Sequence, residues 1–346
     1  MQINKYNLWY IFDDYDIILK EIGDNMRLED VNVKKDLKIV FMGTPDFSVP
    51  VLKGLIENYK VRAIVTQPDH PVGRHGEVRP SPVKQVGIDN TILVLQPEKI
   101  KENINMITSL EPDLIVTCAY GQILPKEILD YPRLGCINVH ASLLPKLRGG
   151  APIHRAIING YKKTGITIMY MAPGMDDGDI ISQEEIEITY EETASTLHDK
   201  LSLLGRELLL KTLPSIIEGT NTRTRQDSSL VTYAMTIKRE DEKIDFSKTT
   251  REIYNQVRGL NSWPGAYCTL GGKILKVWEC REQESVNINA VPGEIVSLYP
   301  DGLGVKVGNG EIVLKVVQPE GKGKMAALDF ARGIMNKENI IGKFLG

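Results

Sequence analysis

Short apolar runs alternate with helix-like stretches from residue 38 onward. The run at 38–42 ends at Gly43, and similar runs lie at 61–65, 92–95, 113–117 and 135–139. Continuous apolar runs of this length are typical of strands buried on both faces of a parallel sheet. Helical stretches at 51–58 and 98–110 separate several of them. Strands alternating with helices predict an α/β domain with a doubly wound, mostly parallel, Rossmann-like sheet.

Two more strand-like segments and a long helix-like stretch complete this region. The segments at 165–170 and 179–188 flank a turn, which predicts a hairpin added antiparallel to the sheet. Residues 193–218 then predict one long helix. Thr193 or Ser195 is its expected N-cap, and Gly219 is expected to end it.

The pattern changes after this helix. A polar stretch follows, then a helix near 251–258, and then short β segments separated by Gly-Gly, Pro-Gly, Asp-Gly and Asn-Gly pairs. Such segments predict a smaller β-barrel, similar to an OB fold. The expected organisation is a loosely ordered extension at 1–36 (with Met26 as an alternative initiator), a catalytic domain at 37–221, a linker at 222–241 and a C-terminal domain at 242–346.

Composition narrows the class of protein. The 346 residues carry a net charge of -3, which excludes a uniformly basic nucleic-acid binder. The charge is uneven, however, with -6 on residues 1–220 and +3 on the remainder. No apolar run is long enough to span a membrane, and the four cysteines are scattered without CxxC spacing. We therefore expect a cytoplasmic, monomeric protein without disulfides or structural zinc.

Two polar side chains lie at the end of the run at 135–139. Period two places Asn138 and His140 on one face of the predicted strand. Ligands of open α/β sheets bind beyond the carboxyl ends of the strands. An amide donor beside an imidazole can stabilise a developing oxyanion, and the imidazole exchanges protons near neutral pH. A structural hydrogen-bonded pair is the alternative, and the position at a strand end leaves both interpretations open.

An acidic turn at 173–179 offers a third partner. It contains Asp176, Asp177 and Asp179, and one of these carboxylates would orient His140 if it faced the ring. A solvated turn explains the same composition, and the spacing of a calcium-binding EF-hand is absent. Composition does not choose among the three acids.

Cofactor loops of common nucleotide-binding proteins are missing. The first strand is followed by Gly43 alone, so neither GxGxxG nor GxxxxGK[ST] is present. This argues against nicotinamide, flavin or nucleotide-triphosphate chemistry. The loop at 69–76 contains Arg74, and Arg79 and Lys84 follow it; these cations are candidates for phosphate contacts.

The chain from about residue 38 onward resembles the formyltransferases that use 10-formyltetrahydrofolate. The most specific match is the segment at 135–145, which reads GCINVHASLLP and continues through 148–153. Residues 261–266 resemble the C-terminal module of those members that act on methionyl-tRNA. Further matches lie at 41–47, 66–69, 81–84, 119–125 and 174–179.

The resemblance implies catalytic roles for Asn138, His140 and Asp176. It implies transfer of the formyl group of 10-formyltetrahydrofolate to the α-amino group of methionyl initiator tRNA, without a metal. Folate contacts are implied for a four-residue loop formed by Ser142, Leu143, Leu144 and Pro145.

The resemblance also implies a tRNA contact for Arg74. The surrounding loop departs from the family pattern, because His70 replaces an arginine and Glu77 stands where a lysine is usual. The alternatives are a formyltransferase acting on an amino sugar nucleotide or a purine precursor, and a non-catalytic folate- or RNA-binding protein.

Overall fold

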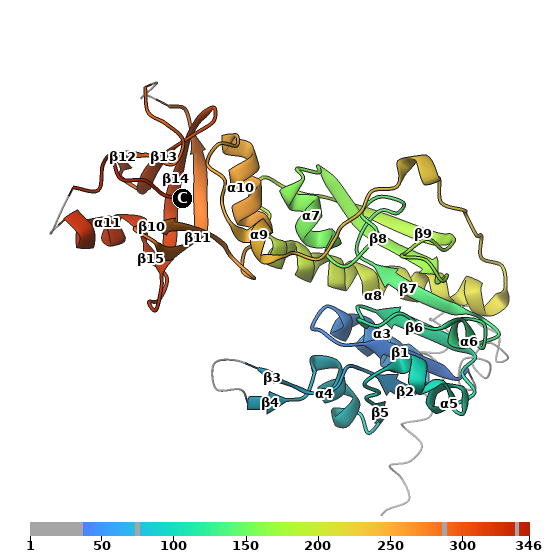
Figure 1. The fold of residues 1–346 in the computed structure, drawn as a ribbon. Coiled ribbons are helices and arrows are strands. Elements are labelled where there is room, and N and C mark those ends of the chain that lie inside the picture. The colour runs from blue at the N-terminus through green and yellow to red at the C-terminus, as the bar shows by residue number, and fades with distance from the viewer. Residues whose placement is uncertain (1–36, 73–76, 286–288, 336–338) are drawn as a thin grey trace, which may run out of the picture.

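A computed structural model describes residues 37–72, 77–285, 289–335 and 339–346. The N-terminal part is a helix-flanked sheet, and the C-terminal part is a second sheet at one end of the molecule (Figure 1). No helix in the described ranges is long and apolar enough to cross a membrane.

The N-terminal sheet has seven strands in the order β5-β2-β1-β6-β7-β8-β9. Strands β5, β2, β1, β6 and β7 run parallel, and β8 and β9 are added antiparallel at one side, which confirms the predicted fold class. The strands are β1 (Ile39–Gly43), β2 (Val61–Val65), β5 (Leu93–Leu95), β6 (Leu114–Cys118), β7 (Cys136–His140), β8 (Lys163–Tyr170) and β9 (Ile180–Glu187).

Helices cover both faces of this sheet. Ile39 and Phe41 of β1 pack with α3 (Ser48–Asn58) and α8 (Ala194–Glu218), whereas Val40 and Met42 pack on the opposite face. Burial on both faces is why β1 is apolar at successive positions. The other elements are β3 (His70–Val72), β4 (Glu77–Arg79), α4 (Pro82–Asp89), η1 (Ile100–Glu102), α5 (Ile104–Thr108), α6 (Lys126–Leu129) and α7 (Pro152–Ile158).

The single helix predicted at 98–110 is wrong. The chain instead forms η1 and α5, separated by Asn103 with φ -127° and ψ 33°. The side-chain amide of Asn103 donates to the carbonyl of Lys99, and Gln122 accepts from the backbone N–H of Ile100. These side-chain bonds replace the regular helical ladder and divide the segment.

The long helix α8 begins and ends as its sequence predicts. Thr193 is the N-cap, and its hydroxyl accepts from the backbone N–H of Thr196. Gly219 ends the helix with φ 69°, a left-handed conformation that glycine adopts at little cost.

The segment at 220–238 packs against the N-terminal domain. Its backbone pairs with the rest of that domain at two places, Thr224 with Ile180 and Tyr233 with Arg148. Two short helices follow, and α10 packs on α7 (Figure 1). The three helical elements are η2 (Ser228–Leu230), α9 (Arg239–Glu242) and α10 (Thr250–Gly259).

The C-terminal sheet is antiparallel, with strand order β10-β11-β14-β13-β12 and β15 paired with β14. Its two edges are linked by the end of the chain, because Leu345 bridges Leu270 and Phe344 bridges Glu294. The elements are β10 (Ala266–Leu270), β11 (Lys273–Gln283), β12 (Ile295–Tyr299), β13 (Gly302–Val307), β14 (Gly310–Pro319), β15 (Met325–Ala326) and α11 (Ala327–Met335).

Polar contacts join the two domains. Arg155 of α7 forms a two-pronged ion pair with Asp241 of α9, with N–O distances of 3.1 and 2.7 Å. The ring of His154 bonds the carbonyl of Gly259 at 2.8 Å. Buried Arg258 donates from α10 to the carbonyls of Thr189 and Glu192. These bonds fix the C-terminal domain against the α7 side of the seven-stranded sheet.

Candidate active site

Asn138 and His140 lie at the carboxyl end of β7, as predicted. The partners of Asn138 across the sheet are Thr117 of β6 and Met169 of β8, and His140 lies beside Thr167 of β8. Strand β7 has a parallel neighbour on one side and an antiparallel neighbour on the other, so its end is held from both sides.

The ring of His140 has two partners. Its Nε2 lies 3.1 Å from the carbonyl oxygen of Leu147, and its Nδ1 lies 3.7 Å from Oδ2 of Asp176. A carbonyl only accepts, so Nε2 carries a hydrogen. In the neutral ring Nδ1 would then present a lone pair to a carboxylate, whereas the imidazolium presents an N–H. The ring therefore has a carbonyl on its Nε2 side and a carboxylate on its Nδ1 side.

The amide of Asn138 is oriented by Thr117. The Oδ1 end of the amide faces the hydroxyl of Thr117 at 2.9 Å, and the same hydroxyl lies 3.1 Å from the carbonyl oxygen of Ile137. The Nδ2 group is consequently on the other side of the amide, where it is available as a donor. No sequence pattern pointed to Thr117, because its contact depends on the pairing of β6 with β7.

The structure distinguishes the three acids of the turn. Asp176 faces His140, and its Oδ2 also accepts from the backbone N–H of Gly149 at 2.8 Å. Asp179 instead pairs with Arg223 at 3.1 Å. Of the three, Asp176 is therefore the carboxylate placed beside the ring.

Gly149 is suited to its contact with the turn. Its φ of 114° is a conformation that side chains rarely adopt, and an added Cβ would lie 3.0 Å from the carbonyl oxygen of Ala234. A glycine here lets the backbone N–H approach the carboxylate closely.

A cavity of about 200 Å³ opens beside Asp176. Its lining is mostly apolar, with an amide from Gln122 and the carboxylate of Asp176 as polar groups. Such a lining suits a flat heterocycle with polar edges. The lining residues are Gln122, Ile123, Leu124, Met169, Met171, Ala172, Pro173, Gly174, Met175 and Asp176.

The loop predicted to contact folate lies apart from this lining. Ser142 and Leu144 are buried. The hydroxyl of Thr167 donates to the carbonyl of Ser142 and accepts from the backbone N–H of Leu144. Gln183 donates to the Leu144 carbonyl at 2.9 Å. Leu143 and Pro145 belong to the same loop, and direct folate contacts of its four residues stay a prediction.

Arg74 lies outside the described residues, so the structure does not place it. Nearby, Lys84 pairs with Asp69 at 2.5 Å. Hydrogen bonds from Lys84 and Gln96 hold the pKa of Asp69 below its usual range. The ammonium group of Lys84 is thus already engaged with a carboxylate.

The cysteine of the strand that carries Asn138 and His140 is not suited to nucleophilic chemistry. Burial raises the pKa of the Cys136 thiol in β7 to about 12. Across the described ranges, no group of three or more His, Cys, Asp or Glu side chains is arranged to hold a metal ion.

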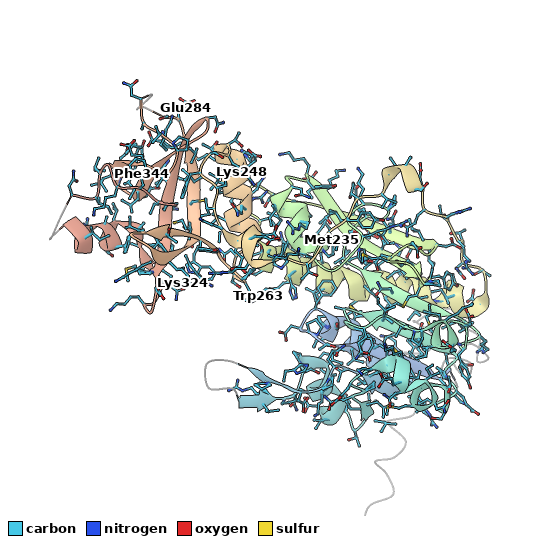
Figure 2. All side chains as sticks on the ribbon, viewed as in Figure 1. Met235, Lys248, Trp263, Glu284, Lys324 and Phe344 are labelled. Atoms are coloured by element: carbon cyan, nitrogen blue, oxygen red, sulfur yellow. The ribbon has the colours of Figure 1, made fainter. Side chains whose placement is uncertain are left out.

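A basic and aromatic surface lies on the C-terminal domain. Trp263 is 71% exposed, and Lys276 donates to the carbonyl of the adjacent Pro264 at 2.8 Å. The ammonium of Lys324 lies 3.6 Å from the centre of the Trp278 ring. Trp263 and Lys324 lie along one edge of the domain, away from Lys248 (Figure 2). Cations beside aromatic rings are typical of surfaces that bind nucleic acids.

Comparison with known proteins identifies the family. Residues 37–213 match the family described as Formyl transferase, and residues 236–335 match Formyl transferase, C-terminal domain. The chain belongs to the formyl transferase family. Asn138, His140, Asp176 and the cavity lie within the first match, and the surface around Trp263 lies within the second.

Curated formyl transferases share about half of their residues with this chain. It is 55% identical over 300 residues to a protein of Bacillus licheniformis, covering 86% of this chain and 95% of that protein. It is 53% identical over 300 residues to a protein of Bacillus subtilis, covering 86% and 94%. Both proteins are named methionyl-tRNA formyltransferase.

Solved structures share the fold at low sequence identity. An N-formyltransferase from Helicobacter canadensis, in complex with folinic acid and dTDP-3-aminofucose, superposes with a TM-score of 0.62 at 20% identity, covering 81% of this chain and 99% of that one. HypX from Aquifex aeolicus in complex with tetrahydrofolic acid gives 0.60 at 16% identity, covering 87% and 48%.

Proposed function

We propose that this chain transfers the formyl group of 10-formyltetrahydrofolate to the α-amino group of methionyl initiator tRNA. The observation that carries this proposal is the position of Asp176, which lines the apolar cavity and lies beside His140 at the end of the strand that also carries Asn138. The names of relatives that are more than 50% identical, with both domains matched, support this choice of substrate.

The attacking group is the free amine of the methionyl ester, and the bond that forms joins its nitrogen to the formyl carbon. The carbonyl oxygen becomes an oxyanion in the tetrahedral intermediate. Nδ2 of Asn138 and the Nδ1–H of charged His140 stabilise that oxyanion. The separation of 3.7 Å between Nδ1 and Asp176 is longer than a hydrogen bond, which leaves this N–H available to the substrate.

Asp176 has two roles in this scheme. Its negative charge supports the imidazolium, and it receives the proton of the attacking nitrogen through a water molecule. Collapse then breaks the bond between the formyl carbon and N10 of the folate, and N10 gains a proton as it leaves. The attacking nitrogen loses one proton and N10 of the folate gains one, so the protein ends the cycle in the protonation state in which it began.

The apolar cavity suits the pterin of the folate. Side chains such as Ile123 and Met171 offer apolar contacts to its rings, and the carboxylate of Asp176 offers a polar one at the edge. The loop formed by Ser142, Leu143, Leu144 and Pro145 supports the strand end from the other side. We propose that the surface around Trp263, Lys276 and Lys324 receives the tRNA, with Arg74 contributing from the N-terminal domain.

The direct test is an assay with three acceptors. Purified protein is incubated with 10-formyltetrahydrofolate and methionyl initiator tRNA, methionyl elongator tRNA or an amino sugar nucleotide. We expect formylation of the initiator tRNA at the highest kcat/KM. Transfer to the sugar nucleotide alone would reassign the substrate, and folate binding without transfer to any acceptor would indicate a binding protein.

A further inference from the structure

Asp176 has a backbone conformation that needs external support. Its φ of 47° lies in the left-handed region, which L residues adopt less readily than glycine. The turn around it therefore requires contacts that hold this conformation. Those contacts decide where the carboxylate lies relative to His140.

Gln226 supplies these contacts from a distant segment. Its Nε2 donates to the carbonyl oxygens of Asp176 and Gly178, both at 2.8 Å. Its Oε1 accepts from Nε and Nη2 of Arg148, at 3.0 and 2.8 Å. The side chain is 8% exposed, and all four hydrogen-bonding positions of its amide are used.

The chemistry of the partners defines the orientation of this amide. Arg148 only donates, and the two carbonyls only accept. Turning the amide around would place donors against donors and acceptors against acceptors. Glutamine is the side chain of this length that can accept on one side and donate twice on the other.

The segment around Arg148 contacts both the turn and the residue that supports it. The guanidinium of Arg148 holds Gln226, and the backbone N–H of the next residue, Gly149, donates to the carboxylate of Asp176. One segment therefore holds both the backbone of Asp176, through Gln226, and its carboxylate, directly.

We propose that Gln226 is a positioning residue for catalysis, acting through Asp176 on the charged form of His140. This inference rests on the proposed formyl transfer. Gln226 bonds the backbone of Asp176 and leaves the carboxylate free for the reaction. The segment at 222–241 thus forms part of the active-site support as well as connecting the domains.

Gln226→Glu is the most informative substitution. Glutamate keeps the length of the side chain and still accepts from Arg148. Its second carboxylate oxygen, however, faces the carbonyl oxygens of Asp176 and Gly178 and has no hydrogen to donate to them. We expect kcat to fall about 10- to 100-fold, because small displacements of reacting groups have effects of this size, while KM for tRNA stays within about twofold. Ser228→Glu adds the same charge at an exposed position two residues away and is the matched control.

A double-mutant cycle separates positioning from a general structural role. If Gln226 acts through Asp176, the variant carrying both Asp176→Asn and Gln226→Glu is no slower than Asp176→Asn alone. Multiplied losses, or full kcat in Gln226→Glu, would overturn the inference. Inactive wild-type protein would instead count against the proposed function.

The geometry is also testable without an activity assay. A crystal structure of Gln226→Glu should show the carboxylate of Asp176 displaced from the ring of His140. An unchanged separation of 3.7 Å would contradict the inference. If this variant does not fold, Gln226→Met, which keeps the volume without the charge, replaces it in the same measurements.

Discussion

The Oδ2 atom of Asp176 lies 3.7 Å from Nδ1 of His140, although the two residues belong to different elements of the sheet domain. The other ring nitrogen, Nε2, faces the carbonyl of Leu147. A carbonyl therefore faces one ring nitrogen, and a carboxylate lies beside the other at a separation longer than a hydrogen bond. This arrangement is the basis of the first prediction.

Asp176→Asn should lower kcat about 100- to 1,000-fold, the range expected when a preorganised charge is lost at an active site. The amide keeps the size of the side chain but neither supports the imidazolium nor takes a proton. Single-turnover formylation measures the effect. Asp177→Asn is the matched control, and equal losses in the two variants would contradict the assignment of Asp176.

Asn138→Ala should reduce kcat by a similar factor, because it removes a donor to the oxyanion. Thr117→Val should have a smaller effect, about five- to tenfold, since it leaves the amide in place and removes a hydroxyl contact that orients it, worth about 1 kcal/mol. Steady-state kinetics with saturating folate separate the two. A Thr117→Val effect as large as that of Asn138→Ala would point to a role beyond orientation.

Lys276→Ala and Lys324→Ala should each raise KM for tRNA and reduce its salt dependence, with little change in kcat. Each phosphate contact contributes about one unit to the slope of log affinity against log salt concentration. Lys248→Ala is the control, because Lys248 lies on another side of the same domain (Figure 2). Unchanged slopes in both test variants would exclude this surface from tRNA binding.

The ion pair of Asp241 with Arg155 should make the domain junction sensitive to acid. Burial raises the pKa of Asp241, but hydrogen bonds from Arg155 and from the Lys238 N–H outweigh it and hold the pKa below 3.8. The stabilisation is therefore complete above pH 3.8 and is lost as the pH falls through the lower folded-state pKa.

Asp241→Asn should accordingly lower the free energy of unfolding by about 1 to 3 kcal/mol at pH 7. The difference from wild type should shrink as the pH falls below 3.8. Urea unfolding at several pH values measures both effects. A difference that is independent of pH would mean that the charge of Asp241 contributes nothing.

Local patterns were sufficient for much of the fold and part of the site. Apolar runs predicted the strands of the parallel sheet because a strand that is buried on both faces, such as β1, is apolar at every position. Period two paired Asn138 with His140 on one face. The capping side chain of Thr193 and the left-handed Gly219 marked the ends of α8. Each of these signals lies within a few residues of the feature it predicts.

Other features depend on residues far apart in the chain. Asp176 was indicated by family resemblance, but its selection over Asp179 is explained physically by the N–H of Gly149, which lies 27 positions away. Gln226 bonds Asp176 across 50 positions from a stretch whose composition suggested only a linker. The helix predicted at 98–110 divides because Gln122, 22 positions from Ile100, accepts its N–H.

Short-range periodicity and capping thus specified the elements and two of the proposed catalytic groups. Packing of separate segments specified which carboxylate meets the imidazole, which amide holds that carboxylate and how the two domains are joined. The physical reason is that a hydrogen bond depends on distance and direction in space. A linear sequence records these only when the two partners share one helix, strand or turn.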